Sequence, residues 1–443
     1  MKQTNYAPNF KIYRSLHAAL FIMALVFSFA SCKKNNTPPA TVTVSSKMLL
    51  MWNDAATVAV TRAGLGPNGP LPPMPESYIY AQVNVAMHDA LNGVYSKYTT
   101  YALKTVDKTA DPDAAVAKAA HDIIVALLPP DAAYADSMYQ ASIGGIPESS
   151  AKTNGITLGQ EAAAAMIAKR ANDGYTTAQI PFTQGTMPGQ YRFTAPFDGP
   201  PFNGFAAVPA WGNITPFGVA SSSQFRPVAP YAVNTPEYAA DYNEIKGMGA
   251  SVNSTRTADQ TQIGLFWLEN SPLGWNRIAR NLIQQKGMDA VEAAHVLGIL
   301  HMALADANIS SLEAKYYYKY WRPITAVQMG DSDGNSSTTG DASFSILAPP
   351  TPPIPDYPSN HAVNGGAASQ VLTDFFGSNV SFTANSSSLA SVTRSFSSFK
   401  AAANENALSR IYVGFHFRNA VEKGEAQGLL IGDYVYKNSL PKL

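Results

Sequence analysis

The sequence predicts an all-α fold in which helical bundles are joined by long irregular connections. After residue 47, apolar residues recur at three- and four-residue spacing, as on the buried face of a helix. Residues that cap or stop helices bound these segments, and no long alternating strand pattern occurs in the N-terminal half. These observations predict a single α-helical domain over residues 47–443.

The composition is that of a packed globular enzyme. Of 443 residues, 11% are aromatic and 14% are charged, and 31 Lys and Arg balance 31 Asp and Glu. A neutral chain without a basic block argues against nucleic acid as a partner. The sequence does not set an oligomeric state, and an oligomer is compatible with it.

Residues 1–32 have the pattern of an export signal. Basic residues precede an apolar run at 18–27, and small residues precede Cys32, the only cysteine in the chain. We predict a lipoprotein signal peptide lipidated at Cys32, followed by a flexible tether at 33–46. This makes the chain an exported bacterial protein, periplasmic or on the outer membrane, whose only membrane contact is the lipid anchor. Because Phe29 replaces the commoner leucine, an ordinary secretory signal is the alternative.

Helices are expected over three segments of the N-terminal half: residues 76–95 with a candidate end at Asn92-Gly93, 111–130 with a stop at Pro129-Pro130, and 157–174. Residues 175–235, rich in Pro, Gly, Phe and Thr, would connect two helical halves, either at the mouth of a pocket or as packing. This connection divides the helices of the domain into two sets.

The second set of helices is expected at 235–250, 257–269, 274–287, 361–377 and 401–436, together with a long apolar segment at 288–321. A helix as apolar as 288–321 belongs in the core of a bundle. Between Pro323 and the helix at 361, a second irregular stretch with prolines near 349–358 fixes an extended approach to Ser359.

Three short motifs in residues 315–416 carry chemistry: Lys315 seven residues before Arg322-Pro323, the turn Pro358-Ser359-Asn360-His361, and Ser409-Arg410 followed by His416. They supply three cations, a hydroxyl, two imidazoles and backbone amides, a set that suits a tetrahedral oxyanion such as phosphate or vanadate. One imidazole can attack or ligate the central atom while the other moves protons. On a straight helix Arg410 and His416 would face apart, so a break near Gly414 would help both reach one pocket.

This pattern resembles the signature shared by vanadium-dependent haloperoxidases and type 2 phosphatidic acid phosphatases. The flanking segments ALADANISSLEAKYYYKYWRPITAV and TPPIPDYPSNHA are similar to bacterial haloperoxidases, and the similarity runs from about Met51 to the C-terminus. The resemblance implies two four-helix bundles around a buried anion site. It also implies a vanadate cofactor, with hydrogen peroxide and a halide or small organic molecule as substrates.

The resemblance also implies a role for each residue of the three motifs. His416 would be the axial ligand of vanadium, or the phosphorylated nucleophile of a phosphatase. The charge of the oxyanion would be neutralised by Lys315, Arg322 and Arg410. Its oxygens would accept hydrogen bonds from Ser359 and the backbone amide of Asn360. His361 would transfer protons as the acid–base residue.

Three positions depart from the family pattern. Asn360 stands where Gly is usual, and its side chain would crowd the pocket or add a donor. Ala420 stands where some members carry an Asp that orients the axial histidine, so Glu422, a backbone carbonyl or another residue would have to serve. Ile354 occupies a position that is often aromatic or His in enzymes that oxidise halides.

The ligand set alone leaves two other functions open. An acid phosphatase, with phosphate in place of vanadate, would use the same residues because the two anions share charge and geometry. A lipid phosphatase is disfavoured, since we expect no apolar run of membrane-spanning length after residue 32. The third alternative is an exported lipoprotein that keeps the fold and only binds a ligand.

Overall fold

Helices dominate the computed structural model, which describes residues 44–64 and 72–443. The predicted signal peptide, Cys32 and most of the predicted tether therefore lie outside the described residues. The described residues all belong to one compact unit.

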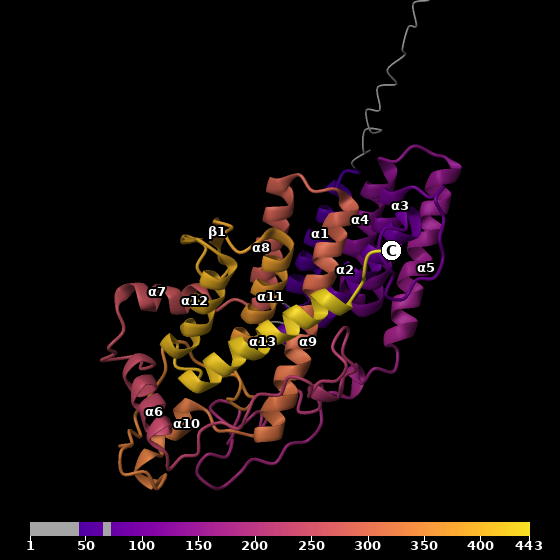
Figure 1. The fold of residues 1–443 in the computed structure, drawn as a ribbon. Helices are drawn as coiled ribbons and strands as arrows, with labels where there is room; N and C mark the ends of the chain where they lie inside the picture. Colours follow the sequence, from indigo (N-terminus) through magenta and orange to yellow (C-terminus); the bar gives the residue numbers. More distant parts are fainter. Residues whose placement is uncertain (1–43, 65–71) are drawn as a thin grey trace, which may run out of the picture. The chain divides into compact units, whose positions relative to one another are not determined.

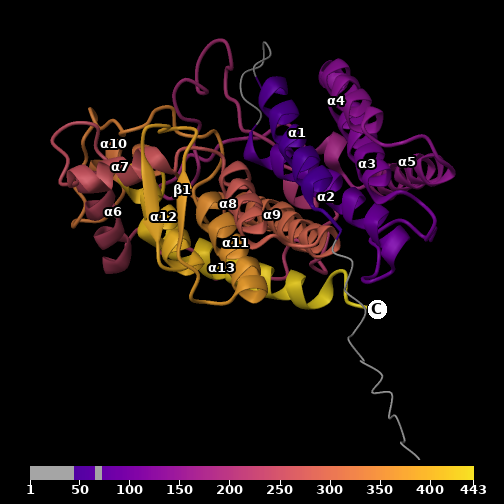
Figure 2. The same ribbon diagram turned by 90° about the horizontal axis from the view of Figure 1, so that it is seen from above.

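The first group of helices comprises α1 (Lys47–Ala63), α2 (Pro73–Tyr95), α3 (Pro112–Leu127), α4 (Ala132–Gly144) and α5 (Ser150–Arg170). Helix α3 packs against the other four, and the group lies together at one end in both views (Figures 1 and 2). The three predicted helices of this region are confirmed, although α2 continues past Asn92-Gly93 to Tyr95. Helix α4 was not predicted, because its sequence carries no clear apolar stripe and few of its residues are buried.

The second group comprises α6 (Pro236–Met248), α7 (Ala258–Phe266), α8 (Ser271–Lys286), α9 (Ala290–Tyr318), α10 (Pro323–Gln328), α11 (Asn360–Phe376), α12 (Phe399–Tyr412) and α13 (Arg418–Asn438). Helix α11 packs against α8, α9, α12 and α13. Two short strands, β1 (Phe382–Asn385) and β2 (Thr393–Phe396), form an unpredicted antiparallel hairpin between α11 and α12. Short 3-10 turns lie at Pro129–Asp131, Tyr175–Thr177, Trp211–Asn213 and Gly330–Ser332. The predicted all-α fold of helical bundles is confirmed.

Helix α9 joins the two groups, because it contacts α2 on one side and α11 and α13 on the other. Its length and composition would allow it to cross a membrane, so the expectation of no such run after residue 32 was wrong. However, 89% of its most apolar window is buried inside the protein, as in the core helix of a bundle. The predicted place of this segment in the core is confirmed.

A buried polar network also links the two groups. Asn53 of α1 donates from Nδ2 to Asn84 Oδ1 of α2 (3.0 Å) and to Asn276 Oδ1 of α8 (2.8 Å). The same Asn276 oxygen lies 2.9 Å from His301 Nε2 of α9. All four side chains are buried, so each depends on the others for its hydrogen bonds.

The long connection at 175–235 docks on α9 and on the segment that follows it. Asp306 of α9, which is fully buried, accepts hydrogen bonds from the backbone N–H groups of Phe217, Gly218 and Val219 at 2.6–2.8 Å. Farther along, an isolated bridge pairs Gln190 with Tyr320. The connection therefore contacts the chain both before Lys315, at Asp306, and after it, at Tyr320.

Candidate active site

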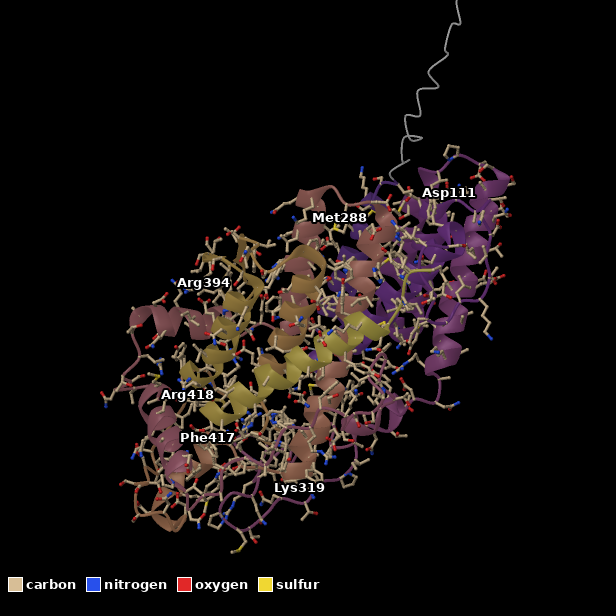
Figure 3. The ribbon with its side chains drawn as sticks, viewed as in Figure 1. Asp111, Met288, Lys319, Arg394, Phe417 and Arg418 are labelled. Atoms are coloured by element: carbon tan, nitrogen blue, oxygen red, sulfur yellow. The ribbon has the colours of Figure 1, made fainter. Side chains whose placement is uncertain are left out.

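The first motif sits where α9 ends. Lys319 adopts a left-handed conformation (φ +51°) that turns the chain, so that Arg322 becomes the N-cap residue of α10 (Figure 3 labels Lys319). Both cations of the motif are 0% exposed. Lys315 Nζ donates to the carbonyls of Pro355 and Asp356 (2.8 and 2.7 Å).

The guanidinium of Arg322 is held mainly by backbone oxygens. Its Nε donates to Ile354 O (2.7 Å) and its NH1 group to Phe415 O (3.0 Å). The NH2 group lies 3.3 Å from Pro352 O. Ile354 thus contributes a carbonyl that orients Arg322, while its side chain is buried.

The second motif forms the N-terminus of α11. Ser359 is the N-cap residue, and its N–H donates to Ala420 O (2.9 Å), which ties this turn to α13. The Ser359 hydroxyl oxygen is buried and has no hydrogen-bond partner in the part of the chain that the structure describes. Because the first helical bond runs from Val363 N to Ser359 O, the N–H groups before it lack an intrahelical acceptor.

The side chain of Asn360 hydrogen-bonds to helix α9. Its Nδ2 group donates to Asn308 Oδ1 on α9 at 3.3 Å, within a ladder of amides that also includes Asn364. This contact orients the amide toward α9, so the expected extra donor is engaged elsewhere.

The third motif spans a helix break, as predicted. Helix α12 ends at Tyr412, and Gly414 has φ +86°, a conformation that favours glycine. A Cβ atom there would also come within 2.6 Å of the Ile346 side chain. After the break, His416 N–H reaches back to Arg410 O (3.3 Å), and α13 begins two residues later, beyond Phe417 (Figure 3).

The three motifs converge on the imidazole of His416. Burial holds the pKa of His416 well below its usual value, and the positive charges of Arg322, Lys315 and Arg410 lower it further. Arg322 NH1 lies 3.1 Å from His416 Nε2 and 3.4 Å from Nδ1. The ring is therefore neutral, as a ligand or nucleophile must be.

His361, the other imidazole, is also neutral. Burial holds its pKa well below the usual value, and the charge of Arg410 adds to this effect. Its Nε2 lies 3.1 Å from the backbone oxygen of Glu269. Because a carbonyl only accepts, Nε2 carries the hydrogen and Nδ1 keeps its lone pair, ready to accept a proton.

The site carries more buried positive charge than negative. Lys315, Arg322 and Arg410 are at most 1% exposed, and burial lowers the pKa of each, that of Arg410 to about 9. The one carboxylate that the described residues place in an ion pair with these cations is Asp356, whose Oδ1 lies 3.8 Å from Arg322 NH1. Burying unpaired charge is costly, so an anion bound here would compensate for it.

The residues present therefore fit an oxyanion. In addition to the cations, the pocket offers the Ser359 hydroxyl, which has no partner among the described residues, and the His416 imidazole. It also offers the first N–H groups of α11, which have no intrahelical acceptor. No cluster of three or more His, Cys, Asp or Glu side chains in the described residues could hold a metal cation. The buried cations and the Ser359 hydroxyl would hold vanadate as an oxyanion, with the His416 imidazole beside it.

Asp356 was missed in the sequence. Its Oδ1 lies 2.8 Å from His416 Nδ1, and both side chains are buried (0% and 6% exposed). The available signal was an acidic residue three positions before Ser359 in the segment DYPSNH. Of the alternatives expected in place of an Asp at position 420, Glu422 points elsewhere: its side chain is 59% exposed and pairs with Arg418 at 3.6 Å.

Comparisons with known proteins find chains that are similar to this one. A family model described as the VCPO second helical-bundle domain matches residues 295–441, which include all three motifs. Vanadium chloroperoxidase from Curvularia inaequalis is 25% identical over 212 residues, 41% of this chain. That match spans only about a third (34%) of the relative's own length.

Solved structures match over most of the chain. A bacterial vanadium-dependent iodoperoxidase is 25% identical, with a TM-score of 0.75 over 90% of this chain and 97% of that one. A bacterial vanadium-dependent chloroperoxidase in its holo form shares the fold at 18% identity, with a TM-score of 0.66 over 85% and 95% of the two chains. The chain is therefore similar in sequence and in fold to vanadium-dependent haloperoxidases.

Proposed function

We propose that the protein is a vanadate-dependent haloperoxidase that oxidises halide with hydrogen peroxide. The observation that supports this most directly is the buried imidazole of His416 beside three buried cations, which pair with one carboxylate, Asp356, in the described residues. When bound, vanadate supplies a Lewis acid that activates the peroxide without a change in oxidation state. The similarity to iodo- and chloroperoxidases supports the reaction class, and the halide is open.

The side chains divide the work between anion binding and proton transfer. Lys315, Arg322 and Arg410 attract the oxyanion and balance its charge. The Ser359 hydroxyl and the N–H groups of the α11 N-terminus donate hydrogen bonds to it. His361 accepts a proton from hydrogen peroxide at Nδ1, while Glu269 O holds its Nε2–H in place.

The test uses the soluble protein from Lys33 onward, stripped of phosphate. We expect peroxide-dependent bromination of a phenol dye, or iodide oxidation, only after orthovanadate is added. Phosphate should suppress this activity because it competes for the same cations. Absence of halide oxidation with chloride, bromide and iodide, despite bound vanadate, would contradict the proposal.

The same samples also test the phosphatase alternative. Hydrolysis of an aryl phosphate without added metal, inhibited by vanadate and unaccompanied by halide oxidation, would assign His416 as a phosphorylated nucleophile instead. Binding of either oxyanion without any turnover would leave a binding lipoprotein.

We also propose that the protein is exported and anchored by a lipid on Cys32, in the periplasm or on the outer membrane. The support is the basic, apolar and small-residue pattern of residues 1–32. In cells that express the full chain, labelled palmitate should be incorporated into the wild type and not into Cys32→Ser. Equal labelling of both proteins would reject the anchor.

A further inference from the structure

Three buried asparagines connect the first turn of α11 to α9: Asn308 on α9, and Asn360 and Asn364 on α11. Each residue is at most 6% exposed. Asn308 Oδ1 accepts from Asn360 Nδ2 and from Asn364 Nδ2, both at 3.3 Å. Asn308 Nδ2 donates in return to Asn364 Oδ1 at 3.1 Å. We call these three side chains the amide cluster.

Backbone carbonyls fix the direction in which the amides face. Asn308 Nδ2 also donates to Leu304 O, one turn earlier on α9 (3.1 Å). Asn364 Nδ2 likewise donates to Asn360 O, one turn earlier on α11 (2.9 Å). Because a carbonyl only accepts, the amide oxygen of Asn308 faces α11. Asn360 can meet this oxygen only with its NH2 group, so the contacts of the amide cluster allow a single arrangement.

The turn that the amide cluster contacts is the one that has backbone donors to offer. The first intrahelical bond of α11 runs from Val363 N to Ser359 O, so the N–H groups of residues 360–362 have no intrahelical acceptor. Hydrogen-bond donors stabilise an anion best when they are held in place before it binds. A contact that fixes this turn therefore bears on the strength of oxyanion binding.

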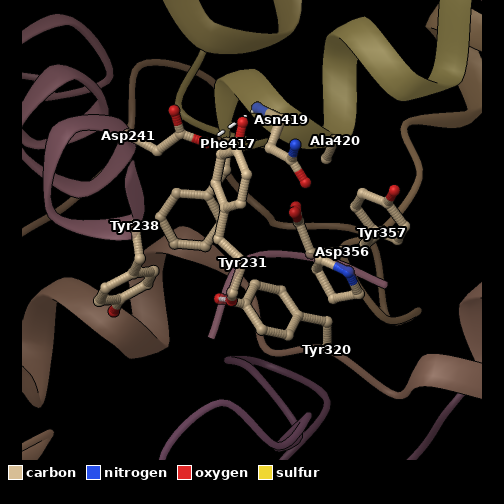
Figure 4. A pocket seen from close by; sticks show the side chains of 10 residues that line it. Tyr231, Tyr238, Asp241, Tyr320, Asp356, Tyr357, Phe417, Asn419 and Ala420 are labelled. Atoms are coloured by element: carbon tan, nitrogen blue, oxygen red, sulfur yellow. Dashed lines mark hydrogen bonds between the residues drawn. The ribbon is translucent and has the colours of Figure 1, made fainter. Parts of the chain in front are cut away.

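Helix α13 contacts the same turn from another direction. Ser359 N–H donates to Ala420 O (2.9 Å), and a Cβ atom at Gly424 would come within 2.8 Å of Ser359 O, so the two backbones are in direct contact. Next to this contact, Asn419 and Ala420 line a small cavity together with Tyr357 (Figure 4). Helix α13 thus holds the start of the turn through its backbone, whereas side chains hold the turn from α9.

We propose that Asn308 is a positioning residue, which holds the first turn of α11 through the amide cluster so that its N–H groups can bind the oxyanion. Lys315 lies seven residues later on the same helix, so α9 sets this cation and the turn of α11 relative to each other. This inference rests on the oxyanion site of the proposed function, and it does not depend on halide oxidation.

Asn84 on α2 provides a matched control. Its Nδ2 donates to Tyr80 O, one turn earlier on the same helix (2.9 Å), and its Oδ1 accepts from Asn53 Nδ2 on α1 (3.0 Å). Like Asn308, it is at most 1% exposed. Asn308→Ala and Asn84→Ala should both lower the melting temperature, because each leaves buried polar groups without a partner. Only Asn308→Ala should change the binding of an oxyanion.

The first measurement is the dissociation constant of orthovanadate and of inorganic phosphate, by titration calorimetry on the phosphate-stripped protein. For Asn308→Ala we expect both anions to bind about 10-fold more weakly, which is the contribution of roughly one hydrogen bond to a charged group. Asn84→Ala should bind both anions as the wild type does. Unchanged constants in Asn308→Ala would overturn the proposal, and so would equal weakening in Asn84→Ala.

The second measurement tests the same contact from α11. Asn360→Ala keeps the backbone N–H and removes the side-chain amide, so it should weaken both anions about as much as Asn308→Ala. In the double variant the two effects should not add, because both substitutions break one contact. Full additivity would overturn the proposal, and unchanged binding in Asn360→Ala would overturn it even if Asn308→Ala fails to fold. A wild type that binds neither anion would reject the oxyanion site itself, and the role of Asn308 with it.

Discussion

His416→Ala should abolish vanadate-dependent halide oxidation, with a loss of about 10³-fold or more, as for other essential catalytic groups. The substitution removes the imidazole whose two nitrogens lie 3.1 and 3.4 Å from Arg322 NH1. Vanadate affinity should fall with turnover, whereas phosphate binding should persist because Lys315, Arg322 and Arg410 remain. Turnover with added vanadate and calorimetric titration of both anions are the measurements.

The matched control is His121→Ala. His121 lies on α3 between Asp122 and Asp136, away from the three motifs, so its loss should leave both quantities unchanged. Added imidazole should restore part of the activity of His416→Ala by occupying the space left by the ring. Full turnover in His416→Ala would reject the site.

His361→Ala has the second largest expected effect, and we expect it to lower turnover without lowering vanadate affinity. Turnover should fall about 10²- to 10⁴-fold, the usual contribution of a general acid–base group, while vanadate affinity changes little. The reason is that His361 is neutral and has a free Nδ1, so it adds proton transfer rather than charge to the pocket. Steady-state kinetics with vanadate saturating, together with vanadate titration, separates the two quantities.

His361→Gln distinguishes proton transfer from structural support. Its amide can still donate to Glu269 O, but it has no group that takes up a proton near neutral pH. It should be as inactive as His361→Ala. Near-normal turnover in the glutamine variant would assign His361 a structural role only.

The sequence predicted the elements whose signals are local. The three motifs, the apolar core helix α9 and the break at Gly414 all follow from residue types at short spacing, and the structure confirms the helix and the break. It also brings His416 to Arg322, whose NH1 lies 3.1 Å from Nε2, and to Arg410, whose carbonyl accepts from His416 N–H at 3.3 Å.

What sequence reasoning missed depends on contacts between distant segments. Asp356 Oδ1 lies 2.8 Å from His416 Nδ1, although the two residues are 60 positions apart in the sequence. No local sequence pattern predicts this contact. The bonds that fix Arg322 come from the backbone oxygens of Pro352, Ile354 and Phe415, which have no signature in a sequence because every residue has a carbonyl. The side chain of Asn360 likewise has its partner, Asn308, on another helix.

Helix α9 belongs both to the segment that the family model matches and to the packing between the two groups of helices. The matched family model begins at residue 295, inside this helix, so a second half that starts at Ala290 would contain every proposed ligand of the oxyanion. Such a fragment would nevertheless leave bare the face of α9 that packs on α2. It would also leave the buried His301 without Asn276, its hydrogen-bond partner on α8, and an unpaired buried polar group costs free energy. We therefore expect the second half to be unstable when it is expressed alone, because the N-terminal helices cover part of its core.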